Sequence, residues 1–396
     1  MGVMMGGVLL ISVLLEGVAR LVELGSLRVM DTGGTLAASG TLFPIVNVEV
    51  PGLAEEDPRL GYRLRPNIFI TSRRYGAMRI NRQGFRGHQV AIPKPPGMFR
   101  ILALGGSTTF GVGVDDAASY PRLLEALLVH RCVPTPQRSI EVVNGGVPGY
   151  TSTQNRRRFE LEWQAFQPDL VLVMDGLNDV ATLPLLTPGR RSDLTASPLL
   201  ASTRTTTLLS GWYRWSLSHS AFVRLLSGHL LEHNAHETHG GPSSEHTLEV
   251  VMQTVRMQLE DNLDRIAALR NVSHFHVAVV GCPGLMGDRA RQYVMELTTR
   301  VVAQGGERGQ RFAAAPSPNR RTHVNLGEGC RLVDAFLRRW ASRHQIPYID
   351  LNEAFARHGQ LNSLYLEDGI HFTREGNVVV AEAIYEQLFG RQCHSY

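Results

Sequence analysis

From residue 99 onwards, short apolar runs alternate with stretches of helical periodicity, and no other feature of the sequence restricts the fold as strongly. The apolar runs are Phe99–Leu104, Ile140–Val143, Asp169–Met174, Phe275–Val280 and Tyr348–Leu351. The helical stretches are Ser119–Arg131, Thr151–Gln167, Glu328–His344 and Thr373–Leu388. Apolar strands that alternate with helices are typical of a parallel sheet covered on both faces. The pattern therefore predicts an α/β fold with about five parallel strands.

Three regions lie outside this alternation. Residues 1–24 contain an apolar segment, and residues 25–97 are an extension rich in turn formers that ends in the stiff linker Pro93–Gly97. Residues 98–396 form one α/β domain, interrupted at about 181–274 by an insertion. We expect helices with an apolar face in this insertion. They form either a lid or side wall of a site, or a helical layer that touches no substrate.

The N-terminal segment allows three interpretations. Val3–Leu15 is apolar except for Ser12, and Glu16 interrupts the run. A helix that spans a membrane needs about 20 apolar residues. A secretory signal has a positive start and a small-residue cleavage site, and this segment offers neither. A membrane anchor is the favoured interpretation, and a cleaved signal and a soluble amphipathic helix are the alternatives.

The charge pattern argues against a nucleic-acid partner. The chain of 396 residues has a net charge of +4, and Lys94 is its single lysine. Arg156–Arg158 is the densest basic run, and it falls on a predicted helix without interleaved aromatic residues. We therefore interpret this run as a solvated helix face.

The cysteines do not indicate a metal site or a disulfide framework. They are Cys132, Cys282, Cys330 and Cys393, and none is close enough to another to form a CxxC motif. One disulfide pair remains open, and so does the redox compartment.

Glycines and polar residues gather in four segments, which are Gly105–Thr109, Asn144–Gly149, Gly176–Asp179 and Asp368–His371. The first three follow predicted strands, and the last precedes the C-terminal helix. Ligands of open parallel sheets bind beyond the carboxyl ends of the strands, so we expect these segments to meet there.

Together the segments offer the groups that acyl transfer through a serine requires. Ser107 is the candidate nucleophile and His371 its base, because Asp368 stands three residues earlier and can orient the ring. The backbone N–H groups of Ser107 and Gly149 and the side-chain amide of Asn178 are candidate oxyanion donors. The alternatives are that Asp368 caps the last helix with His371 at the surface, that Gly149 is a turn glycine, and that Asn178 forms an Asx turn.

No cofactor or metal is expected at these segments. His229, His233 and His236 are spaced so that one helix could present three imidazoles to zinc, but such a set is more often exposed to solvent. The glycines of Gly105–Gly113 are not followed by the Gly-Lys-Ser/Thr of a phosphate-binding loop.

The four segments resemble the sequence blocks of the SGNH hydrolases, also called the GDSL esterase/lipase superfamily. Ser107, Gly149, Asn178 and His371 match the four residues that give the superfamily its name, and Asp368 matches its usual aspartate. The resemblance covers about residues 98–390, with the insertion outside it. It implies a flavodoxin-like three-layer α/β/α sandwich and cofactor-free ester hydrolysis or acyl transfer.

The first block departs from the family pattern. The usual Gly-Asp-Ser-Leu is Gly105-Gly106-Ser107-Thr108 here, so the aspartate is missing. That aspartate is not a triad member, so the chemistry is retained while the local support of the site is expected to differ. An α/β-hydrolase would instead require Gly-x-Ser-x-Gly, and Thr109 occupies the position of the last glycine.

A second resemblance lies in the N-terminal extension. Met78–Gly87 is similar to a segment that precedes the catalytic domain in membrane-anchored bacterial members of the superfamily. It implies a membrane-anchored protein with an extracytoplasmic catalytic domain, and a cytoplasmic location is the alternative.

These resemblances favour a serine esterase that hydrolyses carboxylic esters, acetyl esters among them, of a small molecule or a carbohydrate. One alternative is an O-acyltransferase acting on envelope polysaccharide. The other is a catalytically silent binding protein with the same fold. The sequence predicts no oligomeric state.

Overall fold

The computed structural model describes residues 50, 52–72, 76–132, 139–186, 244–284, 289, 290, 292, 296 and 326–390. The chain divides into two compact units, Met1–Ala37 with Leu186–Val250 and Ala38–Leu185 with Val251–Tyr396. The sheet and the candidate site lie in the second unit, and of the helices described below only Leu186 and residues 244–250, at two helix ends, belong to the first. The predicted anchor at residues 1–24 and the three spaced histidines lie outside the described residues, as does most of the predicted insertion.

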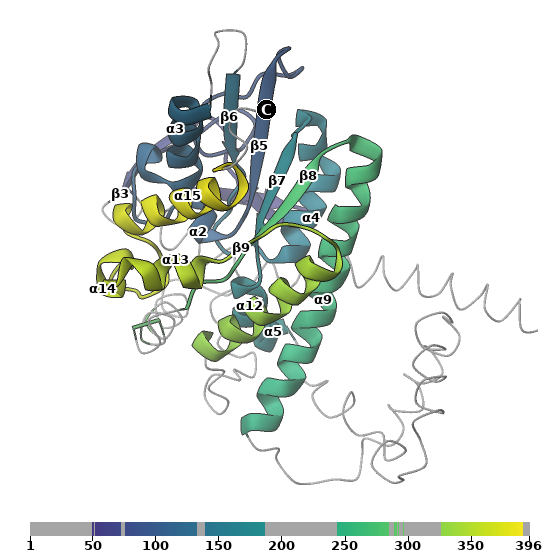
Figure 1. Ribbon diagram of the computed structural model, residues 1–396, viewed down its shortest axis with the longest axis vertical. Helices are drawn as coiled ribbons and strands as arrows, with labels where there is room; N and C mark the ends of the chain where they lie inside the picture. The colour runs from purple at the N-terminus through teal and green to yellow at the C-terminus, as the bar shows by residue number, and fades with distance from the viewer. Residues whose placement is uncertain are drawn as a thin grey trace, which may run out of the picture. The chain divides into compact units, whose positions relative to one another are not determined.

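Five parallel strands form the central sheet (Figure 1). In chain order they are β5 (Met98–Gly105), β6 (Ser139–Asn144), β7 (Leu170–Met174), β8 (His276–Val280) and β9 (Tyr348–Ile349). Their order across the sheet is β6-β5-β7-β8-β9, and every neighbouring pair is parallel. This arrangement confirms the parallel sheet that the apolar runs predict.

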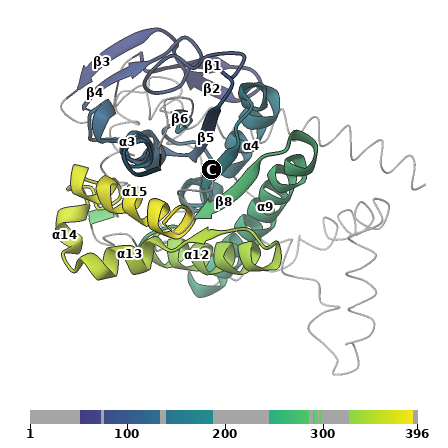
Figure 2. The same ribbon diagram turned by 45° about the horizontal axis from the view of Figure 1, so that its top comes forward.

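Helices cover one face of the sheet through an apolar cluster. They are α3 (Tyr120–Cys132), α13 (Leu351–His358) and α15 (Arg374–Leu388). Leu124, Phe355 and Ile384 come from these three helices and pack with Ile101 and Leu172 of the strands. Figure 2 shows α3, α13 and α15 together on one side of the strands.

The other face is covered by α4 (Ser152–Leu161), α9 (Ser244–Ser273) and α12 (Leu326–Arg343). α12 buries Val333, Leu337 and Trp340, a spacing that places the three side chains on one helix face. Trp340 Nε1 also donates a hydrogen bond to Asp264 Oδ1 of α9 at 2.8 Å. The three layers confirm the predicted α/β/α sandwich.

Two hairpins precede the sheet, and short helices complete the described part. The hairpins pair β1 (Ala54–Asp57) with β2 (Gly61–Leu64) and β3 (Ile68–Ser72) with β4 (Gly76–Ile80), both antiparallel. The short helices are α2 (Ser107–Phe110), η1 (Asp116–Ala118), η2 (Trp163–Phe166), α5 (Leu177–Leu186) and α14 (Leu361–Leu364).

Two predicted boundaries differ from the structure. The helix predicted over Thr151–Gln167 ends at Leu161, and η2 follows because Trp163 and Phe166 turn inward and pack on Phe85. α9 lies wholly inside the predicted insertion at about 181–274, where it forms the crossover from β7 to β8.

The prediction of a solvated face for Arg156–Arg158 is wrong for two of the three side chains. Arg156 and Arg158 are buried. Arg156 Nε donates to Asn262 Oδ1 at 2.7 Å, and the Arg158 guanidinium lies 4.5 Å from the centre of the Trp163 ring. Each guanidinium also pairs with a carboxylate four residues later, Arg156 with Glu160 and Arg158 with Glu162, so local ion pairs and the distant Asn262 together compensate the burial.

The sequence indicated no disulfide framework and left one pair open, whereas the structure contains more than one disulfide. Cys282, just after β8, is bonded to Cys330 of α12, and their Cα atoms lie 5.9 Å apart. Cys132 is also disulfide-bonded. Among the described helices, none is both long and apolar enough to cross a membrane.

Candidate active site

Ser107 is the first residue of α2, the single helical turn that directly follows β5. The N–H of Phe110 donates to Gly106 O and the N–H of Gly111 donates to Ser107 O, each at 3.0 Å, so two bonds close this turn. Ser107 is half-buried. The strand order β6-β5-β7 reverses the direction of the chain crossovers at β5. Open parallel sheets bind their ligands at the carboxyl ends of the strands beside such a reversal, and Ser107 lies there.

The amide of Asn178 lies against the nucleophile segment. Asn178 Nδ2 donates a hydrogen bond to Tyr150 O at 2.8 Å, which fixes the orientation of the amide. A Cβ atom at Gly106 would fall well inside van der Waals contact with the same Nδ2. This close approach gives a physical reason for the glycine where the family has aspartate.

The predicted glycine loop follows β6 and ends beside Asn178. Asn144 begins the loop by accepting the N–H of Gly146 on Oδ1 at 3.0 Å. Gly149 has a φ of 81°, a conformation that residues with a side chain rarely adopt. The bond from Asn178 to the next residue, Tyr150, links this loop to the segment after β7.

Asp368 and His371 are in direct contact. His371 Nδ1 lies 2.8 Å from Asp368 Oδ2, and both side chains are buried. The N–H groups of Ile370 and His371 donate to Asp368 Oδ1, each at 2.9 Å. Burial by itself would raise the pKa of Asp368, but the bonds from the His371 ring and the two N–H groups outweigh it and lower that pKa to about 2. The carboxylate is therefore ionised at neutral pH.

The alternative in which Asp368 caps the last helix is wrong. Thr373 is the N-cap of α15, and its hydroxyl accepts the N–H of Gly376 at 3.1 Å. His371 is buried rather than a surface residue.

Asn377 connects the histidine loop to the nucleophile side of the site. Its Oδ1 accepts the N–H of Tyr120 at 2.9 Å, at the start of α3. Its Nδ2 donates to Phe372 O at 3.2 Å, directly after His371. Asn377 thus joins the start of α3 to the residue that follows His371. Asn377 is not among the predicted site residues, and its signal in the sequence is a polar residue on the apolar side of a helix.

Two buried carboxyl groups follow β7. Asp179 Oδ1 accepts the Ser152 hydroxyl at 2.6 Å, which ties the start of α5 to the start of α4. Asp175 Oδ1 accepts Asn155 Nδ2 at 2.6 Å, while Asp175 Oδ2 has no hydrogen-bond partner among the described residues. Burial and the charge of Asp179 raise the pKa of Asp175 to about 8, so this side chain is neutral near pH 7.

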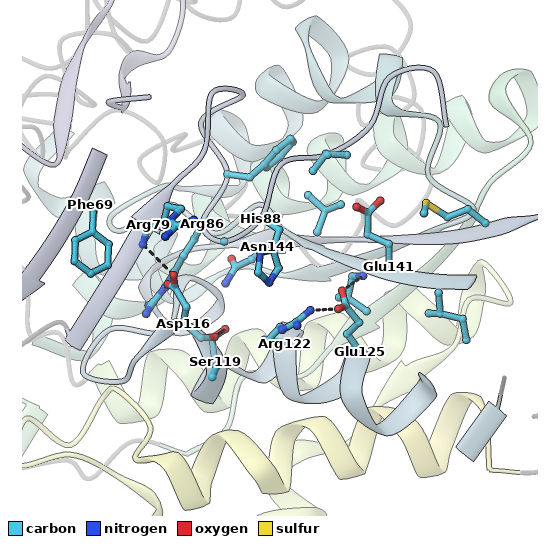
Figure 3. Close-up of a pocket in the computed structure, with 18 residues that line it drawn as sticks. Phe69, Arg79, Arg86, His88, Asp116, Ser119, Arg122, Glu125, Glu141 and Asn144 are labelled. Atoms are coloured by element: carbon cyan, nitrogen blue, oxygen red, sulfur yellow. Dashed lines mark hydrogen bonds and ion pairs between the residues drawn. The ribbon is translucent and has the colours of Figure 1, made fainter. Parts of the chain in front are cut away.

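In the described part of the chain, the candidate triad residues belong to no metal-binding cluster and do not line the cavity found there. In the described part of the chain, no group of three or more His, Cys, Asp and Glu residues is arranged to hold a metal ion. A cavity of about 490 Å³ lies beside the edge strand β6, lined by Phe69, Arg86, Arg122 and Asn144 among others (Figure 3). Ser107 and His371 do not line it.

A family model covers most of the chain. Residues 103–379 match the GDSL-like lipase/acylhydrolase family, a range that includes all five predicted site residues. The chain therefore belongs to this family, and it is an enzyme of the lipase/acylhydrolase type. A comparison with curated proteins found no match.

Several solved structures are similar at low identity. A lipase/acylhydrolase from Enterococcus faecalis is 14% identical, covers 74% of this chain and 97% of its own, and has a TM-score of 0.37. The acetylxylan esterase Axe2 from Geobacillus stearothermophilus is 15% identical over 74% of this chain and 94% of its own, with a TM-score of 0.38. LAE5, an alpha/beta hydrolase enzyme from the metagenome of Lake Arreo, Spain, is 19% identical over 73% and 94%, with a TM-score of 0.37. At these values the likenesses carry no argument about substrate.

The close approach at Gly106 predicts a specific cost for a side chain. We expect Gly106→Ala to lower the free energy of unfolding by about 1–3 kcal/mol, because the new Cβ must displace the Asn178 amide. Gly284→Ala is the matched control, since its Cβ would meet its nearest neighbour at 3.6 Å. Urea unfolding measures both variants, and equal losses would contradict the explanation.

The raised pKa of Asp175 predicts a pH-dependent stability. Between about pH 4 and pH 8 the folded chain holds a proton that the unfolded chain releases, so the free energy of unfolding falls as pH rises. The contribution of one such group reaches about 1.4 kcal/mol per pH unit. We expect Asp175→Asn to remove this slope in urea unfolding between pH 5 and pH 8. The exposed Asp261→Asn is the control and should keep the wild-type slope; a wild-type slope in Asp175→Asn contradicts the assignment.

Proposed function

We propose that the protein hydrolyses carboxylic esters, with Ser107 as nucleophile, His371 as general base and Asp368 as the residue that orients the ring. The observation that carries this proposal is the buried 2.8 Å contact between His371 Nδ1 and Asp368 Oδ2 in a member of an acylhydrolase family. This contact leaves Nε2 as the ring nitrogen that faces the nucleophile in a Ser-His-Asp triad.

The first half of the reaction forms an acyl-enzyme. Ser107 Oγ attacks the carbonyl carbon of the ester while His371 Nε2 takes the hydroxyl proton. The tetrahedral intermediate then collapses, the bond to the alcohol oxygen breaks, and the alcohol leaves with the proton from His371. Asp368 stabilises the imidazolium because its low pKa keeps the carboxylate charged.

The second half releases the acid. Water attacks the acyl carbon with His371 again as base, the bond to Ser107 Oγ breaks, and the proton returns to the serine. The oxyanion of both intermediates accepts hydrogen bonds from the N–H groups of Ser107 and Gly149 and from Asn178 Nδ2. Support for this set comes from the bond between Asn178 and Tyr150, which joins the donor segments.

A fluorophosphonate probe tests the nucleophile. We expect the probe to label the wild-type protein and the exposed-serine control Ser342→Ala, but not Ser107→Ala, because only an activated serine reacts. His371→Asn should lower kcat/KM for p-nitrophenyl acetate by at least about 100-fold through loss of the base. Persistent labelling of folded Ser107→Ala assigns the nucleophile elsewhere, and an unlabelled wild-type protein favours a silent binding protein.

The acceptor of the acyl group decides between hydrolysis and transfer. We propose water as the acceptor, with acetylated small molecules or carbohydrates as substrates. Incubation of an acetyl donor with and without an oligosaccharide tests this choice, and acetate should form at the same rate in both. Acetylation of the oligosaccharide faster than acetate release would replace the esterase proposal by an O-acyltransferase acting on polysaccharide.

We further propose that the catalytic domain works outside the cytoplasm, held at the membrane by residues 1–24. The Cys282–Cys330 disulfide supports this location, because structural disulfides persist in oxidising compartments.

Reporter fusions after residue 30 test the location in bacterial cells. An extracytoplasmic reporter should be active and membrane-bound, and a cytoplasmic reporter at the same position should be silent. The reverse result, together with free Cys282 and Cys330 thiols in the native protein, contradicts the proposal.

A further inference from the structure

Two side chains of the N-terminal extension hold the backbone next to the proposed oxyanion donors. We propose that Tyr62 and Arg86 are positioning residues of the reaction, so that the extension is a working part of the active site. Tyr62 acts on the peptide group of Gly149, and Arg86 acts on the turn that begins with Ser107. This inference rests on the proposed function of those two donors.

Tyr62 holds the peptide group that carries the Gly149 N–H. Its hydroxyl donates to Pro148 O at 2.6 Å, and the side chain is fully buried. The carbonyl of Pro148 and the N–H of Gly149 belong to one planar peptide unit, so a bond to the oxygen fixes the direction of the N–H. A bond to the carbonyl also polarises the peptide group and strengthens its N–H as a donor.

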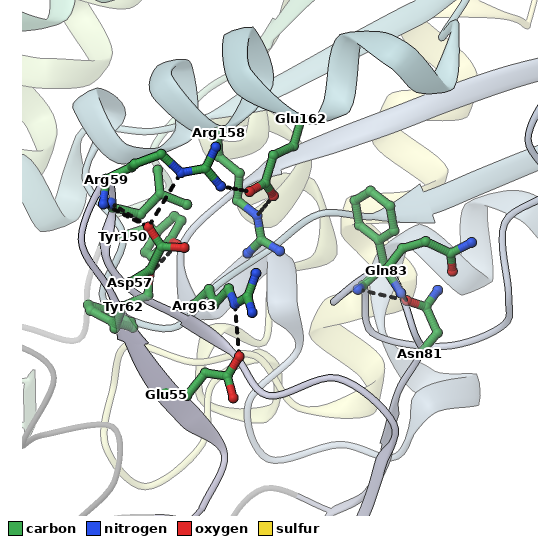
Figure 4. A network of polar contacts seen from close by, with 12 residues as sticks. Glu55, Asp57, Arg59, Tyr62, Arg63, Asn81, Gln83, Tyr150, Arg158 and Glu162 are labelled. Atoms are coloured by element: carbon green, nitrogen blue, oxygen red, sulfur yellow. Dashed lines mark hydrogen bonds and ion pairs between the residues drawn. The ribbon is translucent and has the colours of Figure 1, made fainter.

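Residues of and after the glycine loop in turn donate hydrogen bonds to the β1–β2 hairpin. Tyr150 OH donates to the backbone oxygen of Tyr62 at 2.6 Å, and the two rings meet edge to face with centroids 5.2 Å apart. Gln154 Nε2 also donates to Leu60 O at 2.9 Å. Figure 4 shows Tyr62 and Tyr150 side by side, next to the ion pairs of Arg59 and Arg63. The β1–β2 hairpin is therefore fixed to the glycine loop by groups from both sides.

Arg86 holds the segment that follows Ser107. Its side chain is only 1% exposed, and Nε donates to Asp116 Oδ1 at 2.7 Å. Nη1 donates to Phe110 O at 2.9 Å and Gly111 O at 2.6 Å, and Nη2 donates to Val114 O at 2.6 Å. Figure 3 shows Arg86 and Asp116 together at the cavity beside β6. One guanidinium thus binds three carbonyl groups, of Phe110 at the end of the nucleophile turn and of Gly111 and Val114 after it.

Arg86 restrains the Ser107 N–H indirectly, through its hydrogen bond to Phe110. Phe110 O is held by Arg86, and the Phe110 N–H donates to Gly106 O at 3.0 Å. Gly106 O and the Ser107 N–H belong to the same peptide unit. Arg86 therefore limits the rotation of the second proposed backbone donor, much as Tyr62 limits that of Gly149.

A purely structural role of Tyr62 and Arg86 would also account for these buried contacts. The chain offers controls for that possibility. Arg100 is as buried as Arg86 and binds Glu141, Phe166 O and Ala91 O, but it lies near the start of β5, at the other end from Ser107. Arg63 lies next to Tyr62 on the same hairpin and pairs with Glu55 across it.

Kinetics of conservative variants test the proposal. We expect Tyr62→Phe and Arg86→Lys each to lower kcat for p-nitrophenyl acetate about 10-fold with KM within about 2-fold, because misdirected donors weaken only the transition state. Arg63→Gln and Arg100→Lys should keep kcat within about 2-fold, although Arg100→Lys also loses thermal stability. A wild-type kcat in both folded test variants, or an equal loss in Arg100→Lys, overturns the proposal.

Amide hydrogen exchange keeps the test independent of the proposed function. Arg86→Lys should speed exchange at Gly111 and Val112, whose N–H groups donate to Ser107 O, and Tyr62→Phe should speed exchange at Tyr150, each by about 10-fold or more. If the wild-type protein does not react with fluorophosphonate, the proposed function fails. Unchanged exchange in both variants overturns the positioning role whether or not the wild type is active.

Discussion

The hydrogen bonds that hold β5 between β6 and β7 are the constraint on which the candidate site depends. All three strands run in parallel, and Ala103 pairs with Asn144 on one side and Leu172 on the other. Their carboxyl ends therefore lie at one edge, where Ser107, the glycine loop and Asn178 follow directly. A register shift of one residue would turn every side chain of a strand to the other face. The apolar layers on both faces oppose such a shift.

The N-terminal extension joins this framework through polar groups that are deeply buried. Arg86 and Tyr62 come from the extension and bind carbonyl oxygens of the loops after β5 and β6. Burial of such groups is costly unless each donor has a partner, so their contacts must be well satisfied. The extension is therefore specified by hydrogen-bond geometry as much as by apolar packing, and the same geometry fixes the backbone on either side of the candidate nucleophile.

Patterns between residues close in the sequence predicted the elements that depend on such neighbours. The strands and most helices follow from the spacing of apolar residues, and Asp368 with His371 follows from a short spacing at a helix entrance. The predicted helix end and the predicted solvent exposure were wrong where contacts with residues far away in the sequence determine them. The helix after Thr151 ends at Leu161 because Trp163 and Phe166 pack on Phe85, which precedes them by about 80 positions. Arg156 is buried where Asn262, 106 positions away, accepts a hydrogen bond from its guanidinium.

The fold class, the family and the residue types available for chemistry follow from the amino-acid sequence, since they depend on periodicity and on short motifs. The groups that support those motifs are fixed by long-range packing. Gly106 is required by the approach of Asn178, and the peptide before Gly149 is held by Tyr62, which lies 86 positions before Pro148. Asn377 joins the start of α3 to the histidine loop across 257 positions. Such pairings arise from the packing of whole layers, so no local pattern in the chain specifies them.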